Sequence, residues 1–310
     1  MDTSTALALP ASLQTAVREA VAASTADNTE RAYRSDAAAF VAFTEQQGLC
    51  PMPAAPATVA AFLAAEAEAG KAVATIRRRA ASIAAWHRRQ GIANPCADEL
   101  VRATLRGLAR RRGTDQRQVA AITHTDAAVI RSRMGDSLTD LRDIALILCG
   151  RDLLARSSEL IALEVEAFNF EENGATVAMR RAKTSTETRT YWIGPDAADA
   201  LKNWLTRSGI TQGAVFRSVG KGNLLRGNRL DSRDVRRILK RRAVNASLRH
   251  AANVSGHSLR VGMAQDLAAT NIDIGSIMQA GSWRSISMVA RYTEGVTARR
   301  GAVARFYGRR

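Results

Sequence analysis

Side chains suited to phosphate chemistry lie close together near the C-terminal end of the sequence. The run Gly256–Gly262 carries His257 and Arg260, and their spacing of three residues places both on one face of a helix. Trp283 follows with an indole N–H that can only donate, and Tyr292 follows with a phenol hydroxyl. A hydroxyl nucleophile surrounded by cations, with no metal ligands beside it, is the equipment that attack on a phosphodiester requires.

Residues 255–292 resemble the C-terminal catalytic box of the tyrosine recombinases, the phage integrase family. Trp283 places the resemblance nearest the Cre-like branch, because most of the family carries a second histidine at this position. The segment Leu154–Leu160, in which Arg156 is followed three residues later by Glu159, resembles the first box of the family. Alone, Arg-x-x-Glu is a common ion pair on helix surfaces. In combination with the C-terminal box, the motif is specific.

The resemblance implies a role for each of these residues. Tyr292 is the nucleophile, and its attack on the scissile phosphate gives a 3′-phosphotyrosine and a free 5′-hydroxyl. Arg156 and Arg260 hold the two non-bridging oxygens, His257 contacts the phosphate and assists deprotonation of the phenol, and Trp283 donates a hydrogen bond. Because the covalent bond keeps the energy of the phosphodiester, no ATP, metal or other cofactor is implied.

The resemblance implies two supporting residues as well. Glu159 orients Arg156 from behind. Lys183, in the turn between two expected strands, is the general acid for the 5′ oxygen, a task that suits a compact ammonium group. Arg180 and Arg181 are rival cations in the same turn, but arginine is a poor acid at neutral pH.

The charge balance favours a polyanionic partner. The 310 residues carry 45 basic against 29 acidic side chains, a net charge of +16. Nearly all of the basic residues are arginine, whose planar fork grips phosphate oxygens in pairs. We therefore expect double-stranded DNA as the partner. The alternative from charge alone is an arginine-rich protein whose surface is merely basic.

Other classes of protein find little support in the sequence. Cys50, Cys96 and Cys149 are far apart and show no metal-ligand spacing, so neither a disulfide framework nor a zinc site is indicated. Gly220–Gly222 lacks the spacing of a nucleotide-binding loop. No signal peptide and no apolar run of bilayer length is present, which predicts a bacterial cytoplasmic protein without a membrane partner.

The pattern predicts two domains joined by a linker. Residues 1–11 are expected to be a disordered lead, and 12–112 to form a helical DNA-binding domain with helices near 28–48, 58–69, 73–91 and 97–112. The polar stretch 113–123 is the expected linker, and 124–310 the catalytic domain. There, helices near 125 and 141–148 precede strands near 168–170, 176–179 and 188–193, and helices return near 198–205 and 231–243, after a Gly-rich connection at 208–230. The fold class is therefore mainly α with a small antiparallel sheet.

Basic residues are concentrated in the second half of the helical domain. Residues 1–70 hold three basic and eight acidic residues, whereas 71–112 hold eleven and two. Consecutive arginines lie about 100° apart on a helix, so not all of them can face one groove. The candidates for DNA contact are Arg77, Arg78, Arg79, Arg88, Arg89, Arg106 and Arg110, with Arg111 and Arg112 beside them.

The resemblance further implies a homotetramer that acts on two inverted-repeat sites through a Holliday junction, with the tail after Tyr292 docking into a neighbour. A telomere resolvase or a type IB topoisomerase would use the same chemistry, but the chain size and Trp283 argue against both. A third possibility is a non-catalytic DNA-binding or accessory protein that has kept the fold. Loss of a catalytic position would favour it, and none is lost here.

Overall fold

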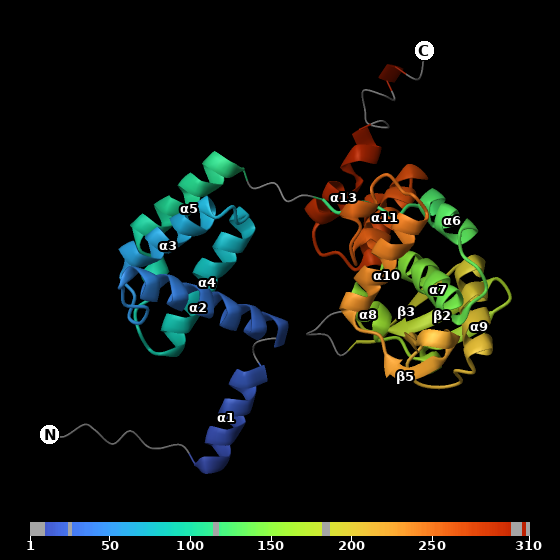
Figure 1. Ribbon diagram of the computed structural model, residues 1–310, viewed down its shortest axis with the longest axis horizontal. Coiled ribbons are helices and arrows are strands. Elements are labelled where there is room, and N and C mark those ends of the chain that lie inside the picture. The colour runs from blue at the N-terminus through green and yellow to red at the C-terminus, as the bar shows by residue number, and fades with distance from the viewer. Residues whose placement is uncertain (1–9, 24–26, 114–117, 182–186, 299–305, 308–310) are drawn as a thin grey trace. The chain divides into compact units, whose positions relative to one another are not determined.

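The computed structural model describes residues 10–23, 27–113, 118–181, 187–298 and 306–307. The chain divides into two compact units, Met1–Arg117 and Gln118–Arg310 (Figure 1). It is mostly helical with small antiparallel sheets, as the sequence predicts. The lead expected over residues 1–11 falls outside the described residues except for its last two. No helix in the described ranges is long and apolar enough to cross a membrane.

The first unit is a group of helices around one apolar core. Phe40 and Phe62 meet edge to face at its centre, with ring centroids 5.1 Å apart, and Ile76, Ile83 and Val101 are buried around them. Helices α2 (Asp27–Gln47), α3 (Pro56–Glu68), α4 (Val73–Arg89) and α5 (Glu99–Arg112) contribute residues to this core, and α1 (Ala11–Ala23) precedes them in the chain.

The second unit packs helices around a small sheet. Its elements are α6 (His124–Ser132), α7 (Leu138–Asp152), α8 (Ser157–Ile161), β1 (Phe168–Glu171), β2 (Gly174–Met179), β3 (Arg189–Ile193), α9 (Pro195–Ser208), β4 (Arg217–Val219), β5 (Leu225–Arg229), α10 (Ser232–Asn245), α11 (Ser258–Ala269), α12 (Ile274–Gly281) and α13 (Ile286–Ala298).

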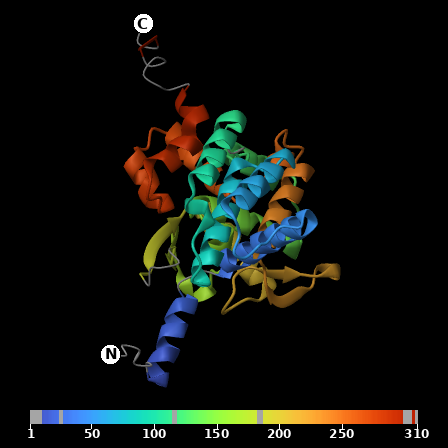
Figure 2. The same ribbon diagram turned by 90° about the vertical axis from the view of Figure 1, so that its left-hand side faces the viewer.

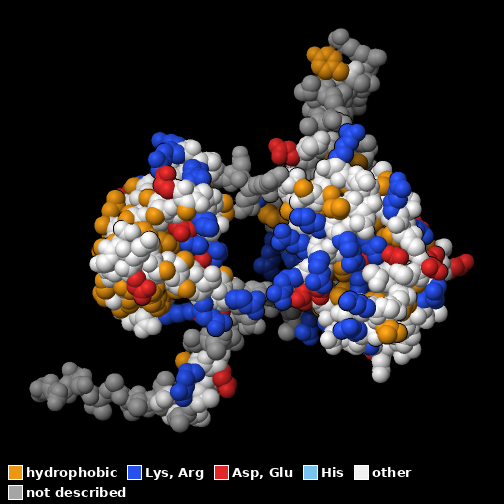
Figure 3. Space-filling model, viewed as in Figure 1, with side chains coloured by type: hydrophobic (Ala, Val, Ile, Leu, Met, Phe, Trp, Pro, Cys, Tyr) orange, Lys and Arg blue, Asp and Glu red, His pale blue; other side chains and the backbone are white. Residues whose placement is uncertain are grey.

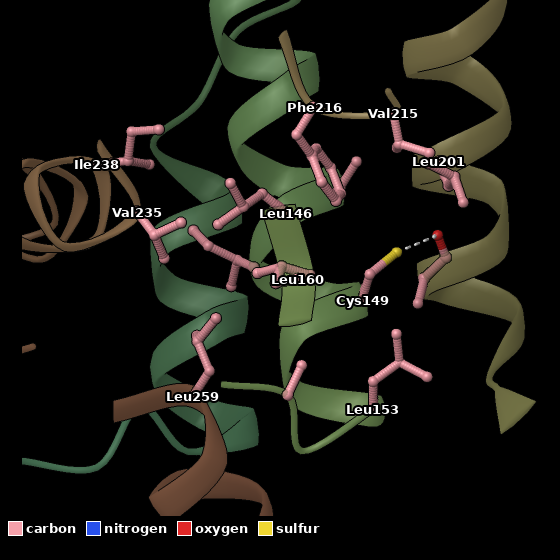
Figure 4. Packing of buried hydrophobic residues seen from close by; sticks show 14 of the residues in the cluster. Leu146, Cys149, Leu153, Leu160, Leu201, Val215, Phe216, Val235, Ile238 and Leu259 are labelled. Atoms are coloured by element: carbon pink, nitrogen blue, oxygen red, sulfur yellow. Dashed lines mark hydrogen bonds between the residues drawn. The ribbon is translucent and has the colours of Figure 1, made fainter. Parts of the chain in front are cut away.

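Helix α7 runs through the centre of the second unit. Figure 4 shows Leu146 of α7 between Phe216 and Leu160, while Cys149 points at α9, where its thiol meets the carbonyl of Ala197. Leu259, the residue before Arg260, packs into the same core. The start of α11 is thereby fixed to the most buried helix of the unit.

The main sheet has the order β1-β2-β3, with antiparallel pairs throughout. Phe170 lies opposite Ala175, and Val177 lies opposite Tyr191, so these side chains share the face that turns toward the core. The chain between β2 and β3 therefore leaves the sheet at the end where Met179 pairs with Arg189.

A second antiparallel pair, β4 and β5, occupies the stretch expected to be only a Gly-rich connection. Its strands pair Val219 with Leu225 and Arg217 with Arg229, with an irregular register between them. Figure 2 shows this hairpin extending from the unit. Every side chain of β5 except Leu225 is exposed, so the sequence lacks the alternation of apolar and polar residues that indicates a strand.

The last part of the expected linker is bound firmly to the second unit. Ile122 is fully buried, and its backbone N–H donates to the carbonyl of Ser258 at 2.9 Å. Gly262 of α11 makes this close approach possible, because a Cβ there would overlap the carbonyl of Ile122. Arg151 binds that same carbonyl and forms an ion pair with Asp266 at 2.7 Å.

Candidate active site

The C-terminal residues with potential for chemistry gather where α11, α12 and α13 meet. The guanidinium carbon of Arg260 lies 4.1 Å from the ring centroid of Trp283. The rings of Trp283 and Tyr292 have centroids 5.8 Å apart. Leu154 and Val289 are buried in the same small apolar cluster, which fixes the indole between the arginine-bearing and tyrosine-bearing helices.

Arg260 is almost completely buried, with 2% of its surface exposed. Its guanidinium donates to the carbonyls of Leu154 at 2.5 Å and Gly281 at 2.6 Å. Burial, followed by the positive charge of Arg156, lowers its pKa to about 10. A guanidinium has five N–H donors, so two carbonyls leave donors for a phosphate oxygen.

Gly281 and Trp283 fit each other closely. A Cβ at position 281 would overlap the six-membered ring of Trp283, so only glycine admits the indole in this position. Ser282 between them has a left-handed backbone, with φ of 51°, and ends α12. The Gly-Ser-Trp sequence is therefore the turn that brings the indole back against Arg260.

Arg156 stands at the start of α8, on the wall of a cleft. Glu159 accepts hydrogen bonds from both the backbone N–H and the guanidinium of Arg156, and these bonds hold the arginine in place. The cleft has a volume of 1060 Å³, and its lining includes Arg156, Glu159, Arg181, Tyr191 and Trp283. Arginine and indole donors thus face one space that is large enough for a phosphate and its sugar.

His257 lies directly before α11 and reaches the surface. Partial desolvation, then the positive charges of Arg260 and Arg156, lower its pKa from the ordinary value of 6.5. The imidazole is therefore neutral at pH 7 and can accept a proton. The charges that hold it neutral are the two arginines expected to bind the phosphate.

Tyr292 lies on α13 with its side chain partly buried. Its backbone carbonyl accepts a hydrogen bond from Gln265 at 3.0 Å, and the carbonyl of Arg291 accepts one from Gln118 at 2.5 Å. Among the described residues, none hydrogen-bonds to the phenol hydroxyl. The backbone is held on both sides while the hydroxyl remains available.

The expected general acid, Lys183, lies outside the described residues. Arg180, just before this gap, is exposed. Arg181 turns inward instead, stacks on Tyr191 at 3.9 Å from the ring centroid, and donates to the carbonyls of Leu153 and Ala280. The sequence indicated only a rival cation at this position, because these partners are far away along the chain.

The arginines expected to contact DNA in the first unit differ in their surroundings. Arg79 is 15% exposed and forms an ion pair with Glu66 at 2.6 Å, so it belongs to the interior of the unit. Arg77 and Arg88 are exposed on one face of α4, eleven residues apart, and neither pairs with a carboxylate in the described ranges. Three further candidates, Arg78, Arg89 and Arg106, pair with Asp36, Glu30 and Glu99, and Arg110 is exposed on α5.

The second unit has a basic face that the sequence reasoning missed. Figure 3 shows Lys and Arg side chains gathered over the region of α8 and α10. On α10, Arg236 and Lys240 are exposed one turn apart, and no described carboxylate pairs with either. Asp143, fully buried in α7, accepts hydrogen bonds from Arg241 and Arg242 and so fixes the opposite side of the helix. The signal in the sequence was the run of basic residues between 233 and 242.

Comparisons with known proteins identify the family of the chain. The model of the Phage integrase family matches residues 84–299. The chain is 32% identical over 283 residues to an integrase/recombinase XerD homolog of Selenomonas ruminantium, a match that covers 87% of this chain and 82% of the relative. It is 26% identical over 274 residues to the recombinase Cre of Escherichia phage P1, covering 82% and 80%.

Solved structures share the fold. The Tn1549 transposon integrase in complex with transposon right end DNA has a TM-score of 0.64 at 16% identity, covering 86% of this chain and 89% of that one. The XerH site-specific recombinase, bound to a palindromic difH substrate in a post-cleavage complex, has a TM-score of 0.60 at 16% identity, covering 82% and 72%.

Proposed function

The chain belongs to the phage integrase family of tyrosine recombinases, and we propose that it is a site-specific recombinase that cleaves and rejoins duplex DNA. The observation that carries the proposal is the contact of one indole, Trp283, with both Arg260 and Tyr292. Through this indole, the proposed nucleophile Tyr292 lies one aromatic ring away from a buried cation. Because the cation is desolvated, its attraction for a phosphate is stronger than it would be in water.

Cleavage requires one bond to form and one to break. The phenol oxygen of Tyr292 bonds to phosphorus, and the bond from phosphorus to the 5′ oxygen breaks. The neutral imidazole of His257 accepts the phenol proton, and Lys183 is the proposed donor of a proton to the leaving 5′ oxygen. The products are a 3′-phosphotyrosine and a 5′-hydroxyl.

Rejoining is the same reaction in reverse, with the 5′-hydroxyl of another strand as the nucleophile. The phosphotyrosine keeps the energy of the original bond, so neither ATP nor a metal ion is needed. Arg156 and Arg260 stabilise the charge that builds up on the non-bridging oxygens in both directions. Losing one such donor typically costs about 3 kcal/mol of transition-state stabilisation.

Exposed basic residues on both units supply the proposed contacts with the DNA backbone. On α4 these are Arg77 and Arg88, on α5 Arg110, and on α10 Arg236 and Lys240. Contacts of this kind determine affinity and register more than sequence preference. Arg79 is not among the proposed contacts, because its guanidinium is bound inside the unit.

The proposed assembly is a homotetramer on two inverted-repeat sites, working in the cytoplasm. Half of the protomers cleave at a time, and the strands pass through a Holliday junction. The palindromic substrate of the XerH relative supports an inverted-repeat target.

Covalent capture tests the function. Purified protein is incubated in EDTA, without ATP, with DNA fragments from its native replicon, and denatured protein–DNA adducts are sequenced. The Tyr292→Phe variant is treated in parallel. We expect adducts at one inverted repeat that are absent from the variant, which should still bind the site. Specific binding by the wild-type protein without any adduct would instead favour the non-catalytic accessory role.

A further inference from the structure

We infer that Arg181 is a positioning residue for cleavage, which holds the two backbone turns on which Arg260 and Trp283 depend. The inference rests on the proposed recombinase function. Arg181 does not touch the reacting atoms in this proposal. It acts through the backbone that anchors the residues that do.

Arg181 and Arg260 each donate hydrogen bonds to the same two backbone segments, one at Leu153–Leu154 and one at Ala280–Gly281. Arg181 donates to the carbonyl of Leu153 and, at 2.5 Å, to that of Ala280. Arg260 donates to the carbonyl of the next residue in each segment, at 2.5 Å to Leu154 and at 2.6 Å to Gly281. Two guanidinium groups thus join the end of α7 to the end of α12 through four hydrogen bonds, two to neighbouring carbonyls in each segment.

Each of the two joined segments contains a strained residue. Leu154 has a φ of 45° and Ser282 a φ of 51°, in the left-handed region that residues other than glycine rarely adopt. Such a conformation costs about 1 kcal/mol or more and persists only where the surroundings impose it. Hydrogen bonds from Arg181 and Arg260 to the neighbouring carbonyls are among the interactions that hold these two residues.

Tyr191 ties Arg181 to the second turn by another route. The guanidinium of Arg181 lies 3.9 Å from the ring centroid of Tyr191. The hydroxyl of Tyr191 is 3.1 Å from the hydroxyl of Ser282, the strained residue that precedes Trp283. Arg181 and Tyr191 therefore fix the turn from the side of the sheet, and Arg260 fixes it from the side of α11.

The backbone of Arg181 also contacts Arg156, the second arginine proposed to bind the phosphate. Its backbone carbonyl accepts a hydrogen bond from the guanidinium of Arg156 at 3.4 Å. Burial lowers the pKa of the Arg181 guanidinium, as expected for a cation taken out of water. A residue that only bound DNA would remain in solvent, as its neighbour Arg180 does.

Removal of Arg181 should leave Leu154 and Ser282 free to relax, and the carbonyls that hold Arg260 would then shift. A misplacement of about 1 Å at a catalytic group can slow a reaction roughly 100-fold. We therefore expect Arg181→Met to slow single-turnover DNA cleavage by about 100-fold, while the affinity for the site changes less than about threefold. Arg207→Met, at an exposed arginine of α9 that does not line the cleft, is the control and should leave the cleavage rate within about threefold.

A double-mutant cycle separates positioning from general loss of structure. Trp283→Phe keeps a ring against Arg260 but removes the indole donor. If Arg181 acts through the Arg260–Trp283 pair, Arg181→Met combined with Trp283→Phe should be slowed by clearly less than the product of the two single effects. Arg207→Met combined with Trp283→Phe should show simple multiplication. Multiplicative effects in both cycles, or wild-type cleavage by Arg181→Met, would overturn the inference.

Backbone amide exchange gives a measurement that does not need activity. The N–H of Trp283 is bonded to the carbonyl of Met278, and that of Leu154 to Arg151. Both amides should exchange faster in Arg181→Met and remain unchanged in Arg207→Met. This test stands even if the wild-type protein forms no adduct, which would count against the recombinase function alone.

Tyr191→Phe is the fallback if Arg181→Met does not fold. This variant removes only the hydroxyl next to Ser282 and should speed exchange at the N–H of Trp283. Unchanged exchange there would overturn the inference.

Discussion

Trp283 and Tyr292 meet with ring centroids 5.8 Å apart and ring planes tilted by 54°. The same indole is stacked with the guanidinium of Arg260 at 4.1 Å. Trp283 therefore separates the proposed nucleophile from the buried cation, and it is also the proposed donor of a hydrogen bond to the phosphate. Its size and its N–H group can be tested separately.

Replacement of Trp283 by histidine should keep most of the activity. An imidazole supplies a ring and an N–H donor at the same point, and histidine occupies this position in most of the family. We expect the single-turnover cleavage rate of Trp283→His to stay within about tenfold of wild type. Trp283→Phe, which keeps the ring without the donor, should lose about 100-fold, since one transition-state donor is worth about 3 kcal/mol. A folded, DNA-binding Trp283→His variant without cleavage would show that the indole itself is required.

Gly281→Ala should destabilise the second unit. The added Cβ would overlap the indole of Trp283, and overpacking of this kind costs about 1–3 kcal/mol. Gly295→Ala on α13 is the control, because a Cβ there meets nothing within 4 Å. The control should stabilise the helix by about 0.5–1 kcal/mol. Urea unfolding of the two variants would measure both effects, and equal stability of the two would contradict the close fit.

The pH dependence of cleavage should reflect His257. Its lowered pKa keeps the imidazole neutral to below pH 6.5, so cleavage should continue at pH 6.5 and fall at lower pH. The unfolded chain binds more protons between the lowered pKa and about 6.5. The stability that neutral His257 contributes is thus fully present above pH 6.5. It is lost as the pH falls from 6.5 through the lowered pKa of the folded protein. An NMR titration of the imidazole with a midpoint above 6.5 would refute this.

Salt dependence should separate arginines that contact DNA from those that support the fold. Arg88→Ala should weaken binding and reduce the slope of log affinity against log salt by about 1, the loss of one phosphate contact. Arg79→Met should leave that slope unchanged and lower the stability of the first unit, since it leaves the partly buried Glu66 without its partner. Binding isotherms between low and moderate salt, with thermal unfolding beside them, would distinguish the two. A reduced slope in Arg79→Met would return that residue to the DNA surface.

The sequence predicts features that depend on nearby residues. Periodic apolar positions locate α2 to α5 of the first unit. Local motifs single out Arg156, His257 and Tyr292, which lie directly before α8, directly before α11 and on α13. Alternation of side chains identifies β1 to β3. The hairpin β4–β5 has no such alternation, because its second strand is exposed along nearly its whole length.

Long-range contacts could not be predicted in this way. Arg77, Arg78 and Arg79 have the same local sequence character, yet only Arg79 is turned inward, toward a glutamate on another helix. Arg181 binds carbonyls that are 28 and 99 residues away. Whether an arginine faces solvent or braces a turn depends on tertiary packing, which neither spacing nor composition contains.

The firm attachment of Gln118–Ile122 to the second unit decides where that unit can be cut free. A fragment that begins at Gln118 would keep Ile122 in its slot beside Gly262, together with the contact from Gln118 to the backbone next to Tyr292. A fragment that begins at Thr123 would lack the buried Ile122, which leaves a cavity beside α11. It would also remove the Ile122 carbonyl, one of the hydrogen-bond acceptors of Arg151. For limited proteolysis or separate expression, the natural end of this half of the protein therefore lies several residues before its first helix.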